Sequence, residues 1–287
     1  MLEWIEQNES VLRLGFFFGI LCLMGLWESF NPARTLLVSR AQRWMNNLGL
    51  VVLNTALLRI IFPTATVGMA VMAEHHGWGV LPQLSLSFGL LVFISVILLD
   101  LIIWLQHVMV HAVPVLWRLH RVHHADPDYD VTTGLRFHPL EIILSMVIKF
   151  FAIVALGPPV VAVIIFEIVL NGMAMFNHGN VSLPAWLDKI LRMVVVTPDM
   201  HRVHHSVLDH ETNSNFGFNL SLWDRLFGTY RAQPDAGHQQ MKIGIHGFDQ
   251  FNQIVRLPGL LSLPFAAHDK DYVINRRSWP KHSGRSS

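Results

Sequence analysis

Hydrophobic and polar positions divide the chain into a long, mostly apolar N-terminal part and a polar C-terminal part. A helix needs about 20 mostly apolar residues to cross a bilayer, and the stretch 84–106 satisfies this with Asp100 as its only charge. Gly157-Pro158-Pro159 interrupts the apolar sequence further on, and because proline blocks a continuous helix, a tight helical hairpin is predicted there. The pattern predicts an all-α integral membrane bundle of four to five membrane helices. The apolar runs lie at 11–30, 48–73, 84–111, 142–156 and 160–177.

Composition agrees with a surface that faces lipid. Charged residues make up 14% and hydrophobic residues 52% of the chain, whereas soluble chains carry about 25% charged residues. The net charge of +1 gives no reason to expect nucleic acid as a partner. Cys22 is the single cysteine, which excludes a disulfide within the chain and a cysteine-based metal site. The 17 histidines are the unusual count.

Lysine and arginine positions predict the orientation in the membrane, because cytosolic connections carry the excess of these residues. Residues 1–10 and 74–83 contain neither type. The pattern predicts five segments, an outer N-terminus and a cytosolic C-terminal region. The basic residues of the connections predicted to be cytosolic are Arg34, Arg40, Arg43, Arg118, Arg121, Arg136, Lys189, Arg192 and Arg202.

Two charges, Arg59 and Glu167, fall inside predicted membrane segments at a similar depth. Because an unpaired charge in the apolar layer is costly, we expect the two side chains to pair. The acidic start MLEWIEQNES lacks the basic region of a cleavable signal peptide, so the first apolar run is expected to be a retained membrane helix.

The chain is expected to have three parts. Residues 1–83 would form N-terminal membrane helices. Residues 84–232 would form a catalytic part that carries the histidine motifs and the membrane hairpin at 142–177. Residues 233–287 would form a cytosolic or interfacial segment with a disordered tail. Because the chain becomes polar and rich in turn residues after 178, the histidine motifs are expected to meet a cytosolic helical cap.

The histidines form three arms with helical spacing. His107 and His111 are four residues apart at the end of the third apolar run, so they share a helix face. The sequence HRVHH occurs twice, and its i, i+3, i+4 spacing also places three imidazoles on one face. Two more histidines lie in distinctive settings, RFHP and NHGN. The copies of HRVHH contain His120, His123 and His124, then His201, His204 and His205, and the other two residues are His138 and His178.

Eight imidazoles in three arms exceed the roughly four ligands of one zinc site, so two metal ions are the economical interpretation. Imidazole suits iron, zinc and copper, and spacing alone leaves the metal open. One HxxHH would be weak evidence, since a lone histidine is usually a hydrogen-bonded core residue. Two copies beside an HxxxH helix end indicate a binuclear site.

Nearby polar side chains are candidates for orienting these rings, because ligating histidines usually donate their second N–H to an acceptor. Asp100, Glu211 and Asn215 are predicted in this role. Asn215 could instead cap a helix. Asp224 is a weaker candidate, with a salt bridge to Arg225 or Arg231 as its alternative role.

In combination and order, these motifs resemble the fatty acid hydroxylase/sterol desaturase superfamily over residues 90–232. The motifs are DLIIWLQHVMVH (100–111), LWRLHRVHH (116–124), RFHPLE (136–141), HRVHH (201–205) and ETNSNFG followed by LWDRLFGT (211–217 and 222–229). The resemblance implies a membrane di-iron enzyme that uses O₂ and two electrons to hydroxylate a lipid C–H position. A lipid desaturase and an ether-lipid monooxygenase remain alternatives on the same site.

Carried over residue by residue, the resemblance implies nine ligands. Some members have a further histidine four residues before the position of His178, where this chain has Ala174, and His138 is then the natural substitute. The haem domain fused to some members is not recognised, so a separate redox partner is expected to supply electrons. That feature and the lack of a clear sorting signal favour a bacterial inner membrane over the endoplasmic reticulum. The implied ligands are His107, His111, His120, His123, His124, His178, His201, His204 and His205.

Two other classes of function were weighed. A metal-ion transporter would place its ligands near the bilayer midplane at helix breaks, whereas these arms lie at or beyond the end of a span. A haem-binding electron carrier would need only axial histidines, and clustered imidazoles on short helices leave little room for a porphyrin.

Overall fold

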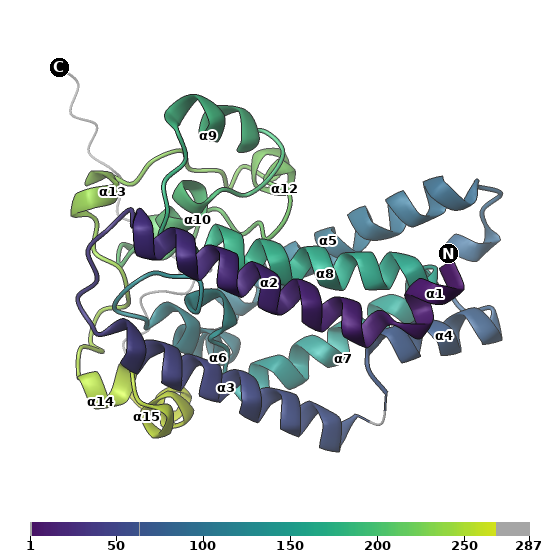
Figure 1. The fold of residues 1–287 in the computed structure, drawn as a ribbon, viewed down its shortest axis with the longest axis horizontal. Helices are drawn as coiled ribbons and strands as arrows, with labels where there is room; N and C mark the ends of the chain where they lie inside the picture. Colours follow the sequence, from purple (N-terminus) through teal and green to yellow (C-terminus); the bar gives the residue numbers. More distant parts are fainter. Residues whose placement is uncertain (1, 63, 268–287) are drawn as a thin grey trace.

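The computed structural model describes residues 2–62 and 64–267, and within these ranges the protein is all-helical with no β-strand (Figure 1). This confirms the predicted fold class. The longer helices are α2 (Glu9–Phe30), α3 (Arg40–Ile61), α4 (Thr66–His76), α5 (Phe88–Ala112), α6 (Pro114–His124), α7 (Pro139–Leu156) and α8 (Val160–Asn177). The shorter ones are α1 (Leu2–Gln7), η1 (Leu81–Gln83), η2 (Thr133–Leu135), α9 (Ala185–Leu191), α10 (Pro198–His204), α11 (Asp209–Thr212), α12 (Leu222–Leu226), α13 (Gly237–Gln240), α14 (Phe251–Ile254), α15 (Leu257–Ser262) and η3 (Leu263–Phe265).

Among the residues that the structure describes, five stretches are long and apolar enough to cross a membrane, which agrees with the predicted number. They are α2, the stretch Arg40–Gln83 that contains α3 and α4, and the helices α5, α7 and α8. The second predicted segment contains two helices, since α3 ends at Ile61 and α4 begins at Thr66. The chain is an integral membrane protein with a cap of short helices gathered at one end of the long ones (Figure 1).

The predicted hairpin is present as α7 and α8. Gly157 ends α7 in the left-handed region at φ 65°, and a Cβ there would lie 2.1 Å from the carbonyl oxygen of Trp78. Gly79 also has a positive φ, and its own Cβ would meet the backbone of Gly157 at 2.2 Å. The turn therefore fits closely against the segment after α4 because both positions lack a side chain.

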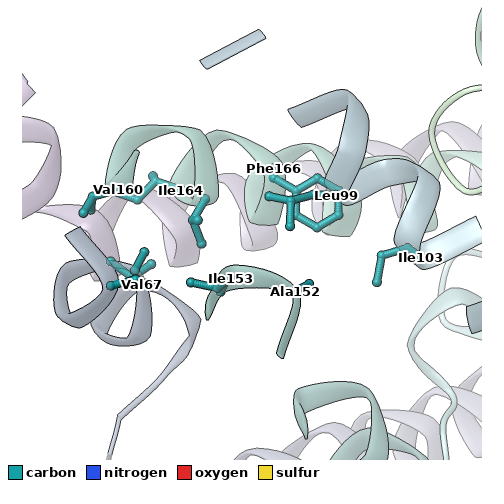
Figure 2. Close-up of a cluster of buried hydrophobic side chains, with 11 residues drawn as sticks. Val67, Leu99, Ile103, Ala152, Ile153, Val160, Ile164 and Phe166 are labelled. Atoms are coloured by element: carbon teal, nitrogen blue, oxygen red, sulfur yellow. The ribbon is translucent and has the colours of Figure 1, made fainter. Parts of the chain in front are cut away.

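Helices α4, α5, α7 and α8 share a buried apolar cluster (Figure 2). Val67, Leu99, Ile153 and Phe166 each come from a different helix of this group. Lipid is as apolar as these side chains, so close van der Waals packing rather than water exclusion stabilises such contacts. The cluster fixes α5, the helix that carries the first histidine arm, against α4, α7 and α8.

The stretch 251–265, within the segment expected to be cytosolic or interfacial, packs partly into the core. Val255 and Leu260 are fully buried and share a cluster with Leu50 of α3 and Trp117 of α6. This cluster joins residues from all three predicted parts, and their boundaries stay a prediction. The tail expected to be disordered lies outside the residues that the structure describes.

The predicted pairing of Arg59 with Glu167 is wrong. Lys149 Nζ lies 2.9 Å from Glu167 Oε1, and Arg13 Nη2 lies 3.5 Å from Glu167 Oε2. Arg59 is on the exposed side of α3. Hydropathy suggested a similar depth for the two charges, but it contains no information on the rotation of each helix about its axis.

Candidate metal centre

Nine buried histidines form two adjacent groups at the cap end of the long helices. Within each group the candidate ligand atoms all lie within 4.8 Å of one another. Group one contains His107, His111, His120, His124 and His204, and group two contains His123, His178, His201 and His205. The structure therefore brings together every histidine of the three predicted arms, together with His178.

The two HRVHH copies are shared between the groups in opposite ways. In α6, His120 and His124 belong to group one and His123 to group two. In the second copy, on α10 and its C-cap, the first and last histidines join group two, and His204 joins group one. At 3.6 residues per turn, i+4 lies about 40° to one side of i and i+3 about 60° to the other. Each helix can therefore supply both groups.

Group two has the spacing of ligands around one ion. His178 Nε2 lies 3.2 Å from the Nε2 of His123 and 3.1 Å from the Nε2 atoms of His201 and His205. Nitrogen ligands about 2.1 Å from a metal lie roughly 3.0–3.4 Å from each other. His178 Nδ1 donates to the carbonyl of Ala174 at 2.7 Å, which turns Nε2 toward the group.

Group one is oriented by acceptors on the far side of its rings. His107 and His204 donate through Nδ1 to the carbonyls of Phe216 and Ser214, each at 2.7 Å. His120 Nδ1 lies 2.6 Å from Glu141 Oε1. Such contacts fix the tautomer and present Nε2 to a metal.

Several inward nitrogens of group one lack a protein partner. The Nε2 atoms of His111, His124 and His204 are buried without a hydrogen-bond partner among the described residues. A buried polar atom without a partner costs about 1–3 kcal/mol. An all-imidazole donor set with free, converging nitrogens fits metal ions.

Burial keeps these imidazoles in the form that binds metal. Loss of hydration lowers the pKa of His178 to about 3. Burial and the neighbouring imidazoles also lower the pKa values of His123, His124 and His205 well below the ordinary value. These four rings are therefore neutral at physiological pH, and neutral imidazole is the ligating species.

The polar residues expected to orient the rings have other partners in the structure. Asp100 accepts from Trp223 Nε1 at 2.8 Å, Glu211 from the Asp235 N–H at 2.5 Å, and Asn215 donates its amide to the Met200 carbonyl at 2.9 Å. They hold the 211–224 segment, whose backbone carbonyls accept from His107 and His204.

Asp224 also holds this segment rather than forming the salt bridge considered for it. It accepts from the backbone N–H groups of Phe216 and Gly217, both at 2.8 Å, and from Trp104 Nε1 at 3.1 Å. By holding the backbone of Phe216, Asp224 fixes the carbonyl oxygen that accepts the hydrogen bond from His107 Nδ1.

The residues that orient the rings directly were missed from the sequence. Glu141 holds His120, and Asn213 Oδ1 lies 3.2 Å from His111 Nδ1. The only local signal for Glu141 was a single acid at the start of an apolar helix, within the motif RFHPLE. Backbone acceptors such as the Phe216 carbonyl leave no signal in side-chain identity.

His138 lies outside both groups. It caps α7, where its Nδ1 accepts from the Leu140 N–H at 3.2 Å, and its Nε2 lies 3.3 Å from the carbonyl oxygen of Leu261. Both ring nitrogens are therefore engaged away from the nine histidines, and the substitution of His138 for the ligand missing at Ala174 has no geometric support.

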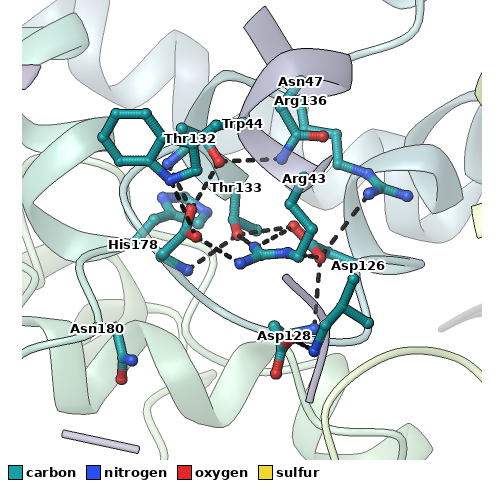
Figure 3. A network of polar contacts seen from close by, with 12 residues as sticks. Arg43, Trp44, Asn47, Asp126, Asp128, Thr132, Thr133, Arg136, His178 and Asn180 are labelled. Atoms are coloured by element: carbon teal, nitrogen blue, oxygen red, sulfur yellow. Dashed lines mark hydrogen bonds and ion pairs between the residues drawn. The ribbon is translucent and has the colours of Figure 1, made fainter. Parts of the chain in front are cut away.

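A buried ion network fixes the loop that follows the first HRVHH copy (Figure 3). Arg43 of α3 donates to both carboxylate oxygens of Asp126, from Nε at 2.8 Å and from Nη2 at 2.7 Å, and also pairs with Asp130. Thr133 Oγ1 donates to Asp126 at 2.9 Å. Burial opposes ionisation of Asp126, but Arg43 and Arg136 hold its pKa below the ordinary value.

A cavity of about 320 Å³ reaches the metal-binding end from between α2, α3, α5, α7 and α8. His107, His120 and Glu141 line one end of it, and Phe17, Ile103 and many other apolar side chains line its walls. The space is continuous from the membrane helices to group one, so an apolar molecule can approach the histidines without crossing the cap.

Replacing Glu141 by glutamine is expected to weaken metal retention and activity by about 10–100-fold, because removing partners of ligating histidines has effects of this size. The measurement is residual metal after a fixed challenge with a chelator, alongside turnover. Glu74→Gln, at an exposed glutamate of α4, is the matched control and should behave as wild type. Unchanged chelator resistance in Glu141→Gln would show that the His120 contact is not needed to hold the ring.

The central part of the chain is similar to known proteins. Residues 92–229 match the family model described as "Fatty acid hydroxylase". The chain is 28% identical to ornithine lipid hydroxylase OlsE of Rhizobium tropici over 64% of this chain and 53% of that protein. It is 29% identical to human alkylglycerol monooxygenase over 45% of this chain and 28% of that protein. With rat cholesterol 25-hydroxylase it shares 24% identity over 50% of this chain and 48% of that protein.

The matched region thus spans about half the length, or less, of these curated relatives. No solved structure matched the chain. All nine clustered histidines lie inside the segment that matches the family model.

Proposed function

Because residues 92–229 match the fatty acid hydroxylase family model, we propose that this chain is a membrane di-iron oxygenase that hydroxylates a C–H position of a lipid. The observation that carries the proposal is that two all-histidine groups are adjacent and that group one lines a cavity that opens among the membrane helices. The five histidines of group one would hold one iron, and the four of group two the other.

The bound irons would supply the oxidising power for O₂ chemistry that no side chain possesses. The overall reaction is RH + O₂ + 2 e⁻ + 2 H⁺ → ROH + H₂O. Glu141, Ser214 and Phe216 keep ligand rings in place, and the apolar cavity wall positions the substrate chain beside His107 and His120 while excluding bulk water. A separate redox partner would deliver the two electrons.

The relatives differ in the lipids that their names specify: an ornithine lipid, an alkylglycerol and cholesterol. A lipid with an alkyl or sterol body therefore fits this chain as substrate. Ether-lipid oxygenation is kept as an alternative because the alkylglycerol monooxygenases align with it. Desaturation at the same site would remove two hydrogens and release two waters.

The cap and its histidines are proposed to face the cytosol, because Arg34, Arg118 and Arg202 all lie near that end of the bundle. A bacterial inner membrane remains the favoured location. A metal-ion transporter fits less well, since both groups lie where the long helices end rather than at the midplane.

The test is lipid analysis of host cells that contain or lack the gene, complemented with wild type or His204→Ala. The expected result is a lipid heavier by one oxygen that depends on the gene and is absent with the variant. A product lighter by two hydrogens would identify a desaturase. Identical lipid profiles in all strains, with the protein present in the membrane, would contradict an oxygenase.

A further inference from the structure

The end of the cavity remote from the histidines is ionic. Arg13 of α2, Lys149 of α7 and Glu167 of α8 all line it, and Glu167 lies between the two cations. Arg13 also pairs with Glu9 on the side away from the cavity lining, at 3.2 Å. Counting only the lining side chains of this end, two cations and one carboxylate leave a net charge of +1.

Within residues 2–62 and 64–267, Lys149 makes one hydrogen bond to another side chain. Its ammonium group carries three donors, and one contact, to Glu167 Oε1 at 2.9 Å, accounts for one of them. The side chain is 16% exposed and that of Glu167 is 6% exposed, so the pair is not a solvated surface bridge. Polar groups withdrawn from water are costly unless they find partners. An alkyl chain end placed here would leave these donors without any.

Two helices independently give the distance between the cavity ends. Glu141 and Lys149 are eight residues apart on α7, which corresponds to about 12 Å along the axis. Glu167 and Ala174, whose carbonyl holds His178, are seven residues apart on α8, or about 10 Å. An extended chain advances about 1.2 Å per bond, so the separation corresponds to roughly ten bonds.

We propose that Lys149, supported by Arg13 and Glu167, is a binding site for the anionic oxygen end group of a lipid, a carboxylate or a phosphate. The lipid chain then lies along the apolar wall, and a carbon roughly ten bonds from that group reaches the histidines. This deepens the proposed function by naming the substrate class, and it rests on that function only for the oxidation step.

Equilibrium binding without turnover tests the site. The purified full-length protein is titrated in detergent with radiolabelled hexadecanoate and, separately, hexadecane. Lys149→Gln keeps a donor for Glu167 and removes the cation. It is expected to weaken hexadecanoate binding about tenfold, the size typical of a charge-assisted hydrogen bond, and to leave hexadecane binding unchanged.

Two variants complete the design. Lys149→Arg restores the cation and should restore hexadecanoate binding. Lys189→Gln, at an exposed lysine of α9, is the matched control and should bind both probes as wild type does. If Lys149→Gln does not fold, hexadecanoate binding is compared between Lys149→Arg and Arg13→Gln instead. Arg13→Gln lowers the charge of this end of the cavity by one, as Lys149→Gln does.

Unchanged hexadecanoate binding in Lys149→Gln, or an equal loss for both probes, would overturn the proposal and leave the ion cluster as a support between helices. Because no oxygen is consumed in this assay, its result is independent of the oxygenase proposal. If the protein binds hexadecanoate through Lys149 but produces no oxidised lipid, the binding site is supported and only the proposed function is refuted.

Discussion

Replacing His178 by alanine is expected to reduce bound metal from about two ions per chain to about one, and to reduce product formation at least about 100-fold. His178 Nε2 is the atom on which the other three nitrogens of group two converge, at 3.1–3.2 Å. Its removal leaves three ligands where about four are usual. Removing a residue that only hydrogen-bonds to a metal ligand already lowers metal affinity or activity by about 10–100-fold. Elemental analysis of detergent-purified protein and an oxygen-uptake assay provide the two measurements.

His204→Ala should lower the metal that group one retains after a chelator challenge, and lower product formation, but less than His178→Ala does, since it removes one of five group-one ligands and leaves four. His204 donates through Nδ1 to the Ser214 carbonyl. His75→Ala is the matched control, because His75 is exposed on α4 and outside both groups. It should keep two ions and full turnover. Full metal content in both His178→Ala and His204→Ala would contradict a binuclear histidine site, whatever the activity.

The histidine groups could be predicted from the sequence because helical spacing determines which side chains share a face. The distances between His107 and His111 and within each HRVHH are properties of single helices. The sharing of each copy between two groups was not visible, although the offset of i+3 from i+4 permits it. It depends on how α6 and α10 face each other, which only the tertiary structure gives.

Most of the site contacts that were predicted wrongly or not at all join segments that are distant in the sequence. Glu141 meets His120, and Lys149 meets Glu167, across helices whose rotation hydropathy does not report. Asp100 was placed correctly on the helix face of His107, yet the tryptophan of a distant short helix, Trp223, occupies its carboxylate. A buried acidic residue near a histidine motif is therefore weak evidence for a direct contact with the rings. The spacing of the histidines is stronger evidence that the rings lie together.

Arg43→Leu is expected to have the largest effect on stability, lowering the free energy of unfolding by about 3–5 kcal/mol, the range for breaking a buried ion pair on one side. Arg43, Asp126 and Asp130 are all fully buried. Without Arg43, the closest remaining cation to Asp126 is Arg136, at 3.8 Å between Nη1 and Oδ1. Arg136 also donates from Nε to the Val122 carbonyl at 2.7 Å and from Nη2 to the Ile254 carbonyl, and these contacts restrict its movement toward Asp126.

Thermal and denaturant unfolding in one detergent measure this effect, with Arg256→Leu as the matched control. Arg256 is an exposed arginine, and surface substitutions of this kind usually change stability by less than about 0.5 kcal/mol. Because Arg43 tethers the loop between the first HRVHH and α7, Arg43→Leu should also lose metal from group two before it unfolds. Equal stability of Arg43→Leu and Arg256→Leu would mean that water or a shifted loop neutralises Asp126 and Asp130, and that the loop holds its shape without the ion network.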